Sequence, residues 1–391
     1  MNKKPWIKWR PGVLSKRQVK DLVDSGYITN VNDIKCIDHS AMDLHLSNEG
    51  CIMLQGSVKP NGPRYAHFLE PNHGYAEKLI PDNDGCYILR TNTTYVFKLV
   101  EELKGFRGSN IYGHATGKST IGRVDVLVRL IVDGMDCYDS FNHDKAEGDL
   151  FLEITPITFD IRVKAGIALT QLRFIFGPDE LSIITKEQLY LYGNEPKLIS
   201  QNQNNEETDS LSVDLSQDEV GNSAASAFRS KPDASKPPID LWEIGKFDPK
   251  EYWDLVSCDK EERIKIEKNS FYILRSKERI QLPGSIAVYC KAMDETIGEM
   301  RIHYAGFVHP FFGSNKDDDI KGTPLIFEVR GHNVDVSLSD NEKMAKLIFY
   351  RMSEDAELDK KEPISVKKTQ AKTKDYQYQS LTLSKIFGNW I

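Results

Sequence analysis

Apolar residues in this chain recur mainly in short runs separated by turn-forming residues, and long helical spacings are few. Residues 40–46 alternate polar and apolar side chains, which predicts a half-buried strand. Residues 14–25 have the spacing of one short surface helix that ends near Gly26. Runs rich in β-branched and aromatic residues predict further strands at residues 87–90, 94–97, 124–132, 149–154, 159–163 and 171–176. The pattern predicts an all-β sandwich or barrel.

The first half of this pattern returns in the second half. Residues 87–90 return as 272–275, 149–154 as 324–329, 159–161 as 334–336 and 172–174 as 347–349, at offsets of 175 to 185 residues. Chance similarity between short apolar runs is the alternative, but the matches keep their order along the chain. We therefore expect two copies of one β domain.

Residues 200–238 separate the two copies with a polar composition. They are rich in Asn, Gln, Ser, Asp and Glu, then in Lys, Pro and Ser. This composition is typical of a linker, although residues 211–215 alternate like a strand and indicate partial order. We expect a first domain over residues 1–199, a linker over 200–238 and a second domain over 239–391.

Charge and cysteine content restrict the class of protein. The 391 residues carry a net charge of -7, which gives no global basic field for nucleic acid. No stretch approaches the length of a membrane span, and residues 1–11 lack the apolar core of a signal peptide. The six cysteines form no C-x-x-C pair and show no zinc spacing. A cytoplasmic protein with reduced thiols is expected.

A glycine-flanked polar stretch, residues 113–123 (GHATGKSTIGR), is the first candidate site and is expected to form a phosphate-binding loop. Lys118, Ser119, Thr120 and Arg123 could bind phosphate, since backbone N–H groups, Lys and Arg recognise anions. The stretch is not a Walker A loop, because only three residues separate its glycines and a strand-like run follows. A solvated turn between two strands is the alternative.

Two carboxylates were considered as acid–base groups. Glu153 lies within the apolar run 150–154, so it is either a structural ion-pair partner or a general base with a shifted pKa. Asp43 and His45 form an alternating pair that is expected to be structural rather than catalytic. The H-x-E and P-C-x-x-C motifs of zinc deaminases are absent from the sequence.

Taken in order, these motifs resemble the dCTP deaminase branch of the dUTPase superfamily, most of all its two-domain bacterial form. The resemblance rests on residues 41–46 (AMDLHL), 118–123 (KSTIGR), the strand Glu153, residues 166–174 (GIALTQLRF), 298–307 (GEMRIHYAGF) and 376–387 (YQYQSLTLSKIF). It extends from about residue 12 to residue 387. It implies two tandem distorted jelly-roll, dUTPase-like β-barrel domains with few short helices, and active sites at subunit interfaces in a trimer-like homo-oligomer.

The resemblance also implies the reaction and the residues that perform it. The expected reaction is hydrolytic deamination of dCTP, as its magnesium complex, to dUTP and ammonia. Glu153 would be the general base and Ser119 and Arg123 would position water and the tetrahedral centre. The substrate-binding residues would be Lys118, Thr120, Asp139, Tyr376 and Gln379. No protein-bound metal or cofactor is implied.

Some residues depart from the family pattern, and other functions remain open. Thr120 stands where a second Ser is common, His309 precedes Pro310 where Asp is usual, and Asp375 precedes Tyr376 where single-domain relatives carry Lys. In the second repeat Glu299 follows Gly298, so that domain is expected to be degenerate, with Glu328 structural or supporting a neighbouring site. The alternatives are a dUTPase-like or bifunctional dCTP-to-dUMP pyrophosphatase and a non-catalytic nucleotide-binding β protein.

Overall fold

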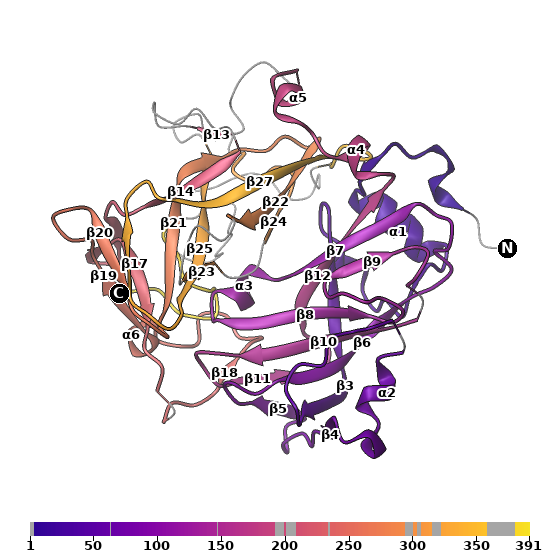
Figure 1. Ribbon diagram of the computed structural model, residues 1–391, viewed down its shortest axis with the longest axis horizontal. Coiled ribbons are helices and arrows are strands. Elements are labelled where there is room, and N and C mark those ends of the chain that lie inside the picture. The colour runs from indigo at the N-terminus through magenta and orange to yellow at the C-terminus, as the bar shows by residue number, and fades with distance from the viewer. Residues whose placement is uncertain are drawn as a thin grey trace. The chain divides into compact units, whose positions relative to one another are not determined.

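The computed structural model describes two compact units, and the chain passes between them more than once (Figure 1). The first comprises Met1–Ser182, Pro232–Glu243 and Arg351–Glu354; the second comprises Ile183–Lys231, Ile244–Tyr350 and Asp355–Ile391. Within them the structure describes residues 4–62, 64–146, 148–191, 199–200, 209–233, 235–293, 300–302, 306–314, 322–357 and 380–391. Each unit is described by itself below.

The first unit is built on one large sheet. Its main strands run in the spatial order β8-β10-β6-β3-β12-β7-β9, and Figure 1 shows β8, β10, β6 and β3 side by side. The strands of the unit are β1 (Gly12–Val13), β2 (Ile28–Thr29), β3 (Met42–Met53), β4 (Ala76–Lys78), β5 (Cys86–Leu89), β6 (Tyr95–Leu103), β7 (Ile111–Gly117), β8 (Val126–Val132), β9 (Ser140–Asn142), β10 (Gly148–Pro156), β11 (Ile161–Lys164), β12 (Ala168–Phe176) and β18 (Ile239–Asp240).

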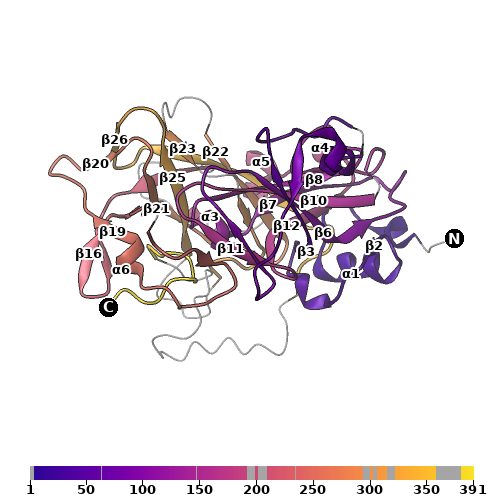
Figure 2. The same ribbon diagram turned by 90° about the horizontal axis from the view of Figure 1, so that it is seen from below.

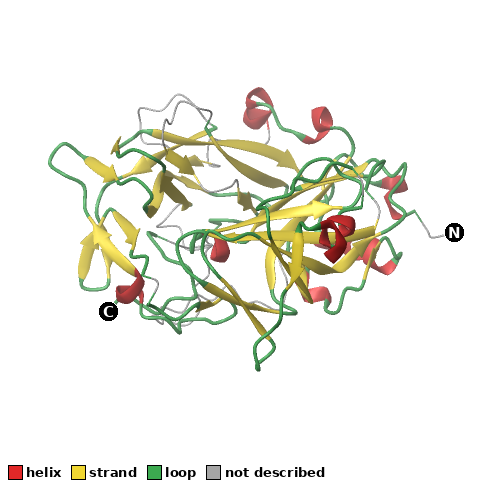
Figure 3. Cartoon of the chain, turned by 60° about the horizontal axis from the view of Figure 1, so that its bottom comes forward, coloured by secondary structure: helices red, strands yellow, loops and turns green. Residues whose placement is uncertain are grey.

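Helices are short throughout the described chain, as Figure 3 shows in red. The longest, α1 (Lys16–Asp24), begins at a capping box in which Ser15 and Gln18 each satisfy the other's backbone N–H. Val19 and Leu22 are the apolar residues that it buries. The others in the first unit are α2 (Ala66–Leu69), α3 (Ser119–Gly122), α4 (Asp179–Ser182) and the 3₁₀ helices η1 (Pro5–Lys8), η2 (Ile34–Cys36) and η3 (Pro71–His73).

The second unit has the same kind of sheet and the helices α5 (Lys186–Leu191) and α6 (Pro249–Tyr252). Figure 2 shows its small sheet, β20 with β26, beside β25. The strands of the unit are β13 (Ile199–Ser200), β14 (Ser210–Asp214), β15 (Asp218–Val220), β16 (Ser223–Ala225), β17 (Ala227–Ser230), β19 (Trp253–Val256), β20 (Arg263–Ile266), β21 (Phe271–Ile280), β22 (Ile286–Ala292), β23 (Met300–Ile302), β24 (Gly306–Val308), β25 (Thr323–Gly331), β26 (Val336–Ser339) and β27 (Lys343–Arg351).

The internal repeat expected from the sequence is present in the strand topology. The second sheet contains the path β23-β25-β21-β14-β27-β22-β24, which matches the order of the first sheet strand for strand. The register matches too. Asp43 of β3 pairs with Gln171 of β12 in the first sheet, and Ser210 of β14 pairs with Lys346 of β27 at the equivalent position of the second sheet. The same β-bulge follows in both pairs. An irregularity kept in both copies is a designed feature of the fold.

One of the sequence matches is wrong. Residues 272–275 repeat the letters of residues 87–90, but Tyr272 occupies the ladder position of Tyr95, since Ile154 pairs with Tyr95 and Val329 with Tyr272. Each tyrosine hydroxyl also accepts the backbone N–H five residues upstream, at 2.9 Å and 3.1 Å. The true counterpart is therefore residues 95–98, at an offset of 177 residues.

Each unit buries a glutamate on its long central strand, β6 or β21. Glu101 accepts hydrogen bonds from the backbone N–H of His45 at 2.9 Å and lies 2.6 Å from its Nδ1. Glu278 accepts the backbone N–H and the hydroxyl of Ser212, both at 2.7 Å. A buried carboxylate with donors to both oxygens is satisfied, so these pairs join neighbouring strands of the two sheets. His45 thus has a structural partner, as expected.

Much of the stretch expected as a linker is ordered. Residues 210–230 carry β14 to β17, and β14 lies between β21 and β27 in the second sheet. The alternating pattern at residues 211–215 therefore predicted this ordered part correctly.

All six cysteines, each among the described residues, are free thiols. No helix in the described part of the chain has the length and apolar character that a membrane crossing requires.

Candidate active site

Glu153 lies in the middle of the first sheet, on β10. It pairs with Val96 of β6 on one side and with Arg129 of β8 on the other. Its side chain shares a face of β10 with Phe151, because side chains two residues apart point the same way. Phe151 belongs to an apolar cluster with Tyr65 and Ile131. The carboxylate is 5% exposed, so the strand alternation places a charge beside apolar surface.

Two hydroxyl groups hold this carboxylate. Ser57 donates to Oε1 at 2.8 Å and Tyr138 donates to Oε2 at 2.9 Å. Burial raises the pKa of Glu153 above its usual value, while the two hydroxyl bonds and the charge of Arg129 lower it in part. A carboxylate that is held in one orientation and has a raised pKa is suited to accept a proton from a reacting group and to return it.

Asp139 joins the same group of side chains through Arg129. The guanidinium of Arg129 forms an ion pair with Asp139 and lies 4.5 Å from the ring centre of Tyr138. The other oxygen of Asp139 accepts the backbone N–H of Leu130 at 2.7 Å. Burial raises the pKa of Asp139 to about 6, against the opposing effect of Arg129. The predicted sugar-binding residue and the predicted base therefore lie in one cluster.

The polar stretch at residues 113–123 differs from the loop expected. Residues 113–117 belong to β7, and the turn itself is the single helical turn α3. Lys118, just before α3, forms an ion pair with Asp43 of β3. Ser119 is exposed, whereas Thr120 and Arg123 are buried at 7% and 2% exposure. A side chain at Gly117 would lie 2.8 Å from Val128, so glycine lets the turn approach β8.

Within one chain, α3 and Glu153 lie at different places along the β8–β10 ladder. Val126 at the start of β8 pairs with Pro156, three residues beyond Glu153. Three residues of strand span about 10 Å, and Arg123 lies three residues before Val126. The predicted residues therefore form two separate groups within one chain. One contains Glu153 and Asp139, and the other contains Lys118 and Asp43.

Three side chains near Glu153 were not expected from the sequence, and two of the expected residues lie outside the described part of the chain. Ser57, Arg129 and Tyr138 are 96, 24 and 15 residues from Glu153 in sequence. Only the fold brings them together, although Tyr138 stands beside the predicted Asp139. Tyr376 and Gln379 fall in the stretch 358–379, outside the described residues.

The second unit places Glu328 where the first places Glu153. Glu328 pairs with Ile273 as Glu153 pairs with Val96, and it is half-buried. In the second unit Gly306 of β24 lies opposite Cys290 of β22. At the equivalent place in the first unit, the backbone N–H of Ala115 donates to the carbonyl of Asp139. Gly306 therefore corresponds to Asp139, and Cys290 to Ala115. Burial and the charge of Glu328 together raise the pKa of Cys290 to about 12. Gly298 and Glu299, on which the expectation of a degenerate second domain rests, lie outside the described residues.

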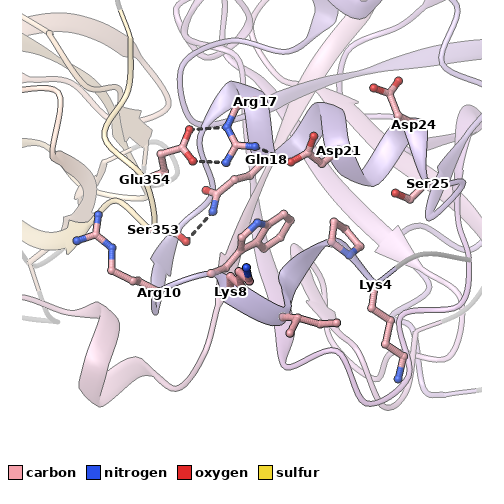
Figure 4. A pocket seen from close by; sticks show the side chains of 13 residues that line it. Lys4, Lys8, Arg10, Arg17, Gln18, Asp21, Asp24, Ser25, Ser353 and Glu354 are labelled. Atoms are coloured by element: carbon pink, nitrogen blue, oxygen red, sulfur yellow. Dashed lines mark hydrogen bonds and ion pairs between the residues drawn. The ribbon is translucent and has the colours of Figure 1, made fainter.

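A cavity of about 730 Å³ opens elsewhere in the first unit, beside η1 and α1 (Figure 4). Three of its charged side chains pair with one another: Arg17 binds Glu354, with Nε 2.7 Å from Oε1, and also binds Asp21 at 2.9 Å. Gln18 donates to Ser353 at 2.8 Å. None of the described residues predicted as catalytic or substrate-binding lines this cavity.

Comparisons with known proteins assign both parts of the chain to one family. The family model described as 2'-deoxycytidine 5'-triphosphate deaminase N-terminal domain matches residues 10–178, and the corresponding C-terminal domain model matches residues 185–387. The crystal structure of 2'-deoxycytidine 5'-triphosphate deaminase from Agrobacterium tumefaciens superimposes with a TM-score of 0.78 at 25% identity, over 89% of this chain and 97% of that chain. No curated protein sequence matched the chain. With both family models matched in order, the chain belongs to the 2'-deoxycytidine 5'-triphosphate deaminase family.

Proposed function

We propose that the first unit hydrolyses dCTP to dUTP and ammonia, with Glu153 as the general base. The observation that carries this proposal is the buried Glu153 carboxylate, which has a raised pKa and is oriented by Ser57 and Tyr138. Family membership supplies the substrate class.

The proton balance of the reaction needs one such group. Water attacks C4 of cytosine and gives a proton to Glu153, which passes it to N3. A second proton, from the new hydroxyl, goes through Glu153 to the amino group, and the C4–N4 bond then breaks to release ammonia. A general base of this kind contributes roughly 10²–10⁴-fold to the rate.

The remaining predicted residues have supporting roles in this proposal. Ser119 and Arg123 position the water and stabilise the tetrahedral centre, where preorganised donors are most effective. Lys118 and Thr120 contact the phosphates, Asp139 the sugar, and Tyr376 and Gln379 close the site. Magnesium enters with dCTP, and no protein ligand for a catalytic metal is proposed.

The separation of α3 from Glu153 within one chain favours a site shared between copies. About 10 Å of ladder, plus the residues before β8, lie between the two groups. We propose that the chain works as a homo-oligomer with trimer-like packing, in which α3 of one copy faces Glu153 of another. A cytoplasmic location without nucleic-acid or membrane partners completes the proposal.

The test is ammonia release from purified protein with dCTP, dCMP and CTP in parallel. Glu153→Gln keeps the size and hydrogen bonding of the side chain but cannot take a proton, so it should bind dCTP and lose about 10²-fold or more of the activity. Glu328→Gln, at the same ladder position of the second unit, is the matched control and should keep its activity. A Glu153→Gln variant with more than about a tenth of wild-type activity would contradict the assigned base.

The alternatives are distinguished when pyrophosphate is measured together with ammonia and dUTP is added as a further substrate. Pyrophosphate released together with ammonia would identify a bifunctional dCTP-to-dUMP enzyme, and pyrophosphate from dUTP alone a dUTPase-like enzyme. Binding of dCTP without ammonia would identify a nucleotide-binding protein.

A further inference from the structure

A group of metal-binding side chains lies in the first unit, apart from the residues used above. His67 is on α2, Glu70 follows α2 and His73 ends η3. One ligand atom from each can be chosen so that all three lie within 4.8 Å of one another. Nε2 of His73 is 3.3 Å from Oε2 of Glu70, and the two imidazole rings are 3.8 Å apart between centroids.

The backbone fixes these side chains in a compact segment, residues 65–74, which we call the histidine turn. The N–H groups of His67, Phe68 and His73 bond to carbonyls three residues upstream, at 3.2, 2.9 and 3.1 Å. Gly74 ends the turn with φ of +69°, a conformation that glycine adopts without strain. The three ligand side chains are therefore held on one short, closed segment.

The histidine turn is anchored to the core by its aromatic residues. Tyr65 is 1% exposed and belongs to the cluster that contains Phe151, against which Phe68 also packs. The Tyr65 backbone N–H donates to Asp133 at 2.8 Å, and its hydroxyl donates to the carbonyl of Val58 at 2.7 Å. The imidazoles and the carboxylate are exposed, so an ion from solvent has access to them.

We propose that the histidine turn binds one Zn²⁺ through His67, Glu70 and His73. Two imidazole nitrogens and one carboxylate oxygen form a donor set that zinc uses in proteins, with water in the fourth position. Zn–N and Zn–O bonds of about 2.0–2.1 Å give a tetrahedral edge of about 3.3 Å. The 3.3 Å distance between Glu70 and His73 already equals this edge, and a change of side-chain rotamer would bring in the third ligand atom, which lies within 4.8 Å of the others.

This zinc is separate from the deamination chemistry. Neither Glu153 nor its hydroxyl donors belong to the histidine turn, and the buried ring of Tyr65 is 5.7 Å from that of Phe151, on the core side of the turn. The ion would bridge α2 to η3 and fix the turn by joining residues that are three and six positions apart. The site was not expected from the sequence, because the H-x-x-E-x-x-H spacing of His67, Glu70 and His73 matches neither a cysteine pair nor a zinc-deaminase motif.

The test measures metal binding on the full chain and needs no activity. Protein stripped with a chelator and dialysed is titrated with ZnCl₂ by calorimetry, and Co²⁺ is added to a second sample to read the visible absorption of the bound ion. We expect one Zn²⁺ per chain and a tetrahedral Co²⁺ spectrum. Mg²⁺ and Ca²⁺ should not compete, because imidazole ligands favour transition metals.

Variants locate the ion. His67→Ala and His73→Ala should each weaken Zn²⁺ binding by about tenfold or more, since even changes behind the ligands cost 10- to 100-fold. Glu70→Gln should weaken it as well, and His332→Ala in the second unit is the matched control with unchanged affinity. Absence of Zn²⁺ binding by the wild type would overturn the proposal. So would Zn²⁺ affinities of His67→Ala and His73→Ala that equal the affinity of the wild type.

Hydrogen exchange gives a second readout. Zn²⁺ should increase the protection of the His67, Phe68 and His73 amides by several-fold in the wild type and not in His73→Ala. Because the ligand side chains are exposed, the variants should fold, and thermal unfolding without metal should coincide with that of the wild type. Bound Zn²⁺ with unchanged protection of these amides would place the ion elsewhere and refute the assignment.

Discussion

Removal of the Tyr138 hydroxyl provides a direct test of how the structure controls Glu153. Burial raises the pKa of the Glu153 carboxyl, and the hydrogen bonds from Ser57 and Tyr138 lower it by stabilising the charged form. Tyr138→Phe removes the 2.9 Å bond to Oε2 and leaves a ring of similar shape under Arg129. Without this donor the charged form is less stable, so the pKa of Glu153 should rise further.

The expected size of the effect follows from the strength of the lost bond. A hydrogen bond to a charged group contributes about 1.5–3 kcal/mol, and one pKa unit corresponds to 1.36 kcal/mol. The pKa should therefore rise by about one to two units. A general base is active when ionised, so activity is lost as pH falls through its pKa, and the acid limb of the profile should move to higher pH.

The assay is kcat/KM for ammonia release from dCTP between about pH 5 and 9, because this parameter reports the free enzyme. Ser57→Ala should move the acid limb in the same direction. Tyr112→Phe, which removes a hydroxyl bonded to Asp179 in the same unit, is the matched control and should leave the limb in place. An acid limb that stays fixed or moves to lower pH in Tyr138→Phe would refute the reasoning.

Three further predictions concern stoichiometry, the C-terminal segment and metals. Calorimetric titration should give one dCTP per chain, because Gly306 of the second unit replaces the Asp139 position; two per chain would contradict the inequality of the units. Tyr376→Ala and Gln379→Ala should raise KM for dCTP with little change in thermal stability, and an unchanged KM would remove these residues from the site. Protein stripped of zinc should keep its kcat once Mg²⁺ is present, and a loss of kcat that only zinc restores would contradict a metal-free mechanism at the base.

Truncation of the C-terminal segment would test the roles of Tyr376 and Gln379 less clearly than point variants would. Truncation after Lys374 would remove the proposed lid, but it would also remove Leu383, Ile386 and Phe387, which are buried. Phe387 packs on Tyr252 and Trp253, with ring centroids 5.5 and 5.9 Å apart. Loss of such a core residue costs about 3–5 kcal/mol. Point variants at Tyr376 and Gln379 separate substrate closure from packing.

Strand positions could be predicted from the sequence because they depend on local alternation. The runs at 149–154 and 171–176 fall within β10 and β12, and the run at 94–97 lies within β6 except for its first residue. Register depends on partners far away in sequence, so the shared letters of residues 87–90 and 272–275 gave a false match. The same limit applied at residues 113–117, where two glycines indicated a loop and pairing with β12 makes a strand.

The candidate site shows the same division between local and long-range information. A carboxylate inside an apolar strand identified Glu153, because burial of a charge is visible in the pattern itself. Its hydroxyl donors come from a segment 96 residues away and from a turn before β9, and neither donor has a distinctive neighbourhood in the sequence. The group could be located, but the means of orienting it could not.

Comparison of the two units distinguishes the buried carboxylates whose arrangement both units share from Glu153, whose surroundings differ between them. Glu101 and Glu278 are both buried, at 1% and 4% exposure, and each binds the neighbouring strand through a backbone N–H and a side chain. Their partners changed from His45 to Ser212, yet the arrangement survived, as a structural role requires. The residues around Glu153 differ between the two units, because Gly306 stands at the position equivalent to Asp139. The surroundings of Glu153 thus persist in only one of the two copies of the fold, as the proposed catalytic role of Glu153 in the first unit requires.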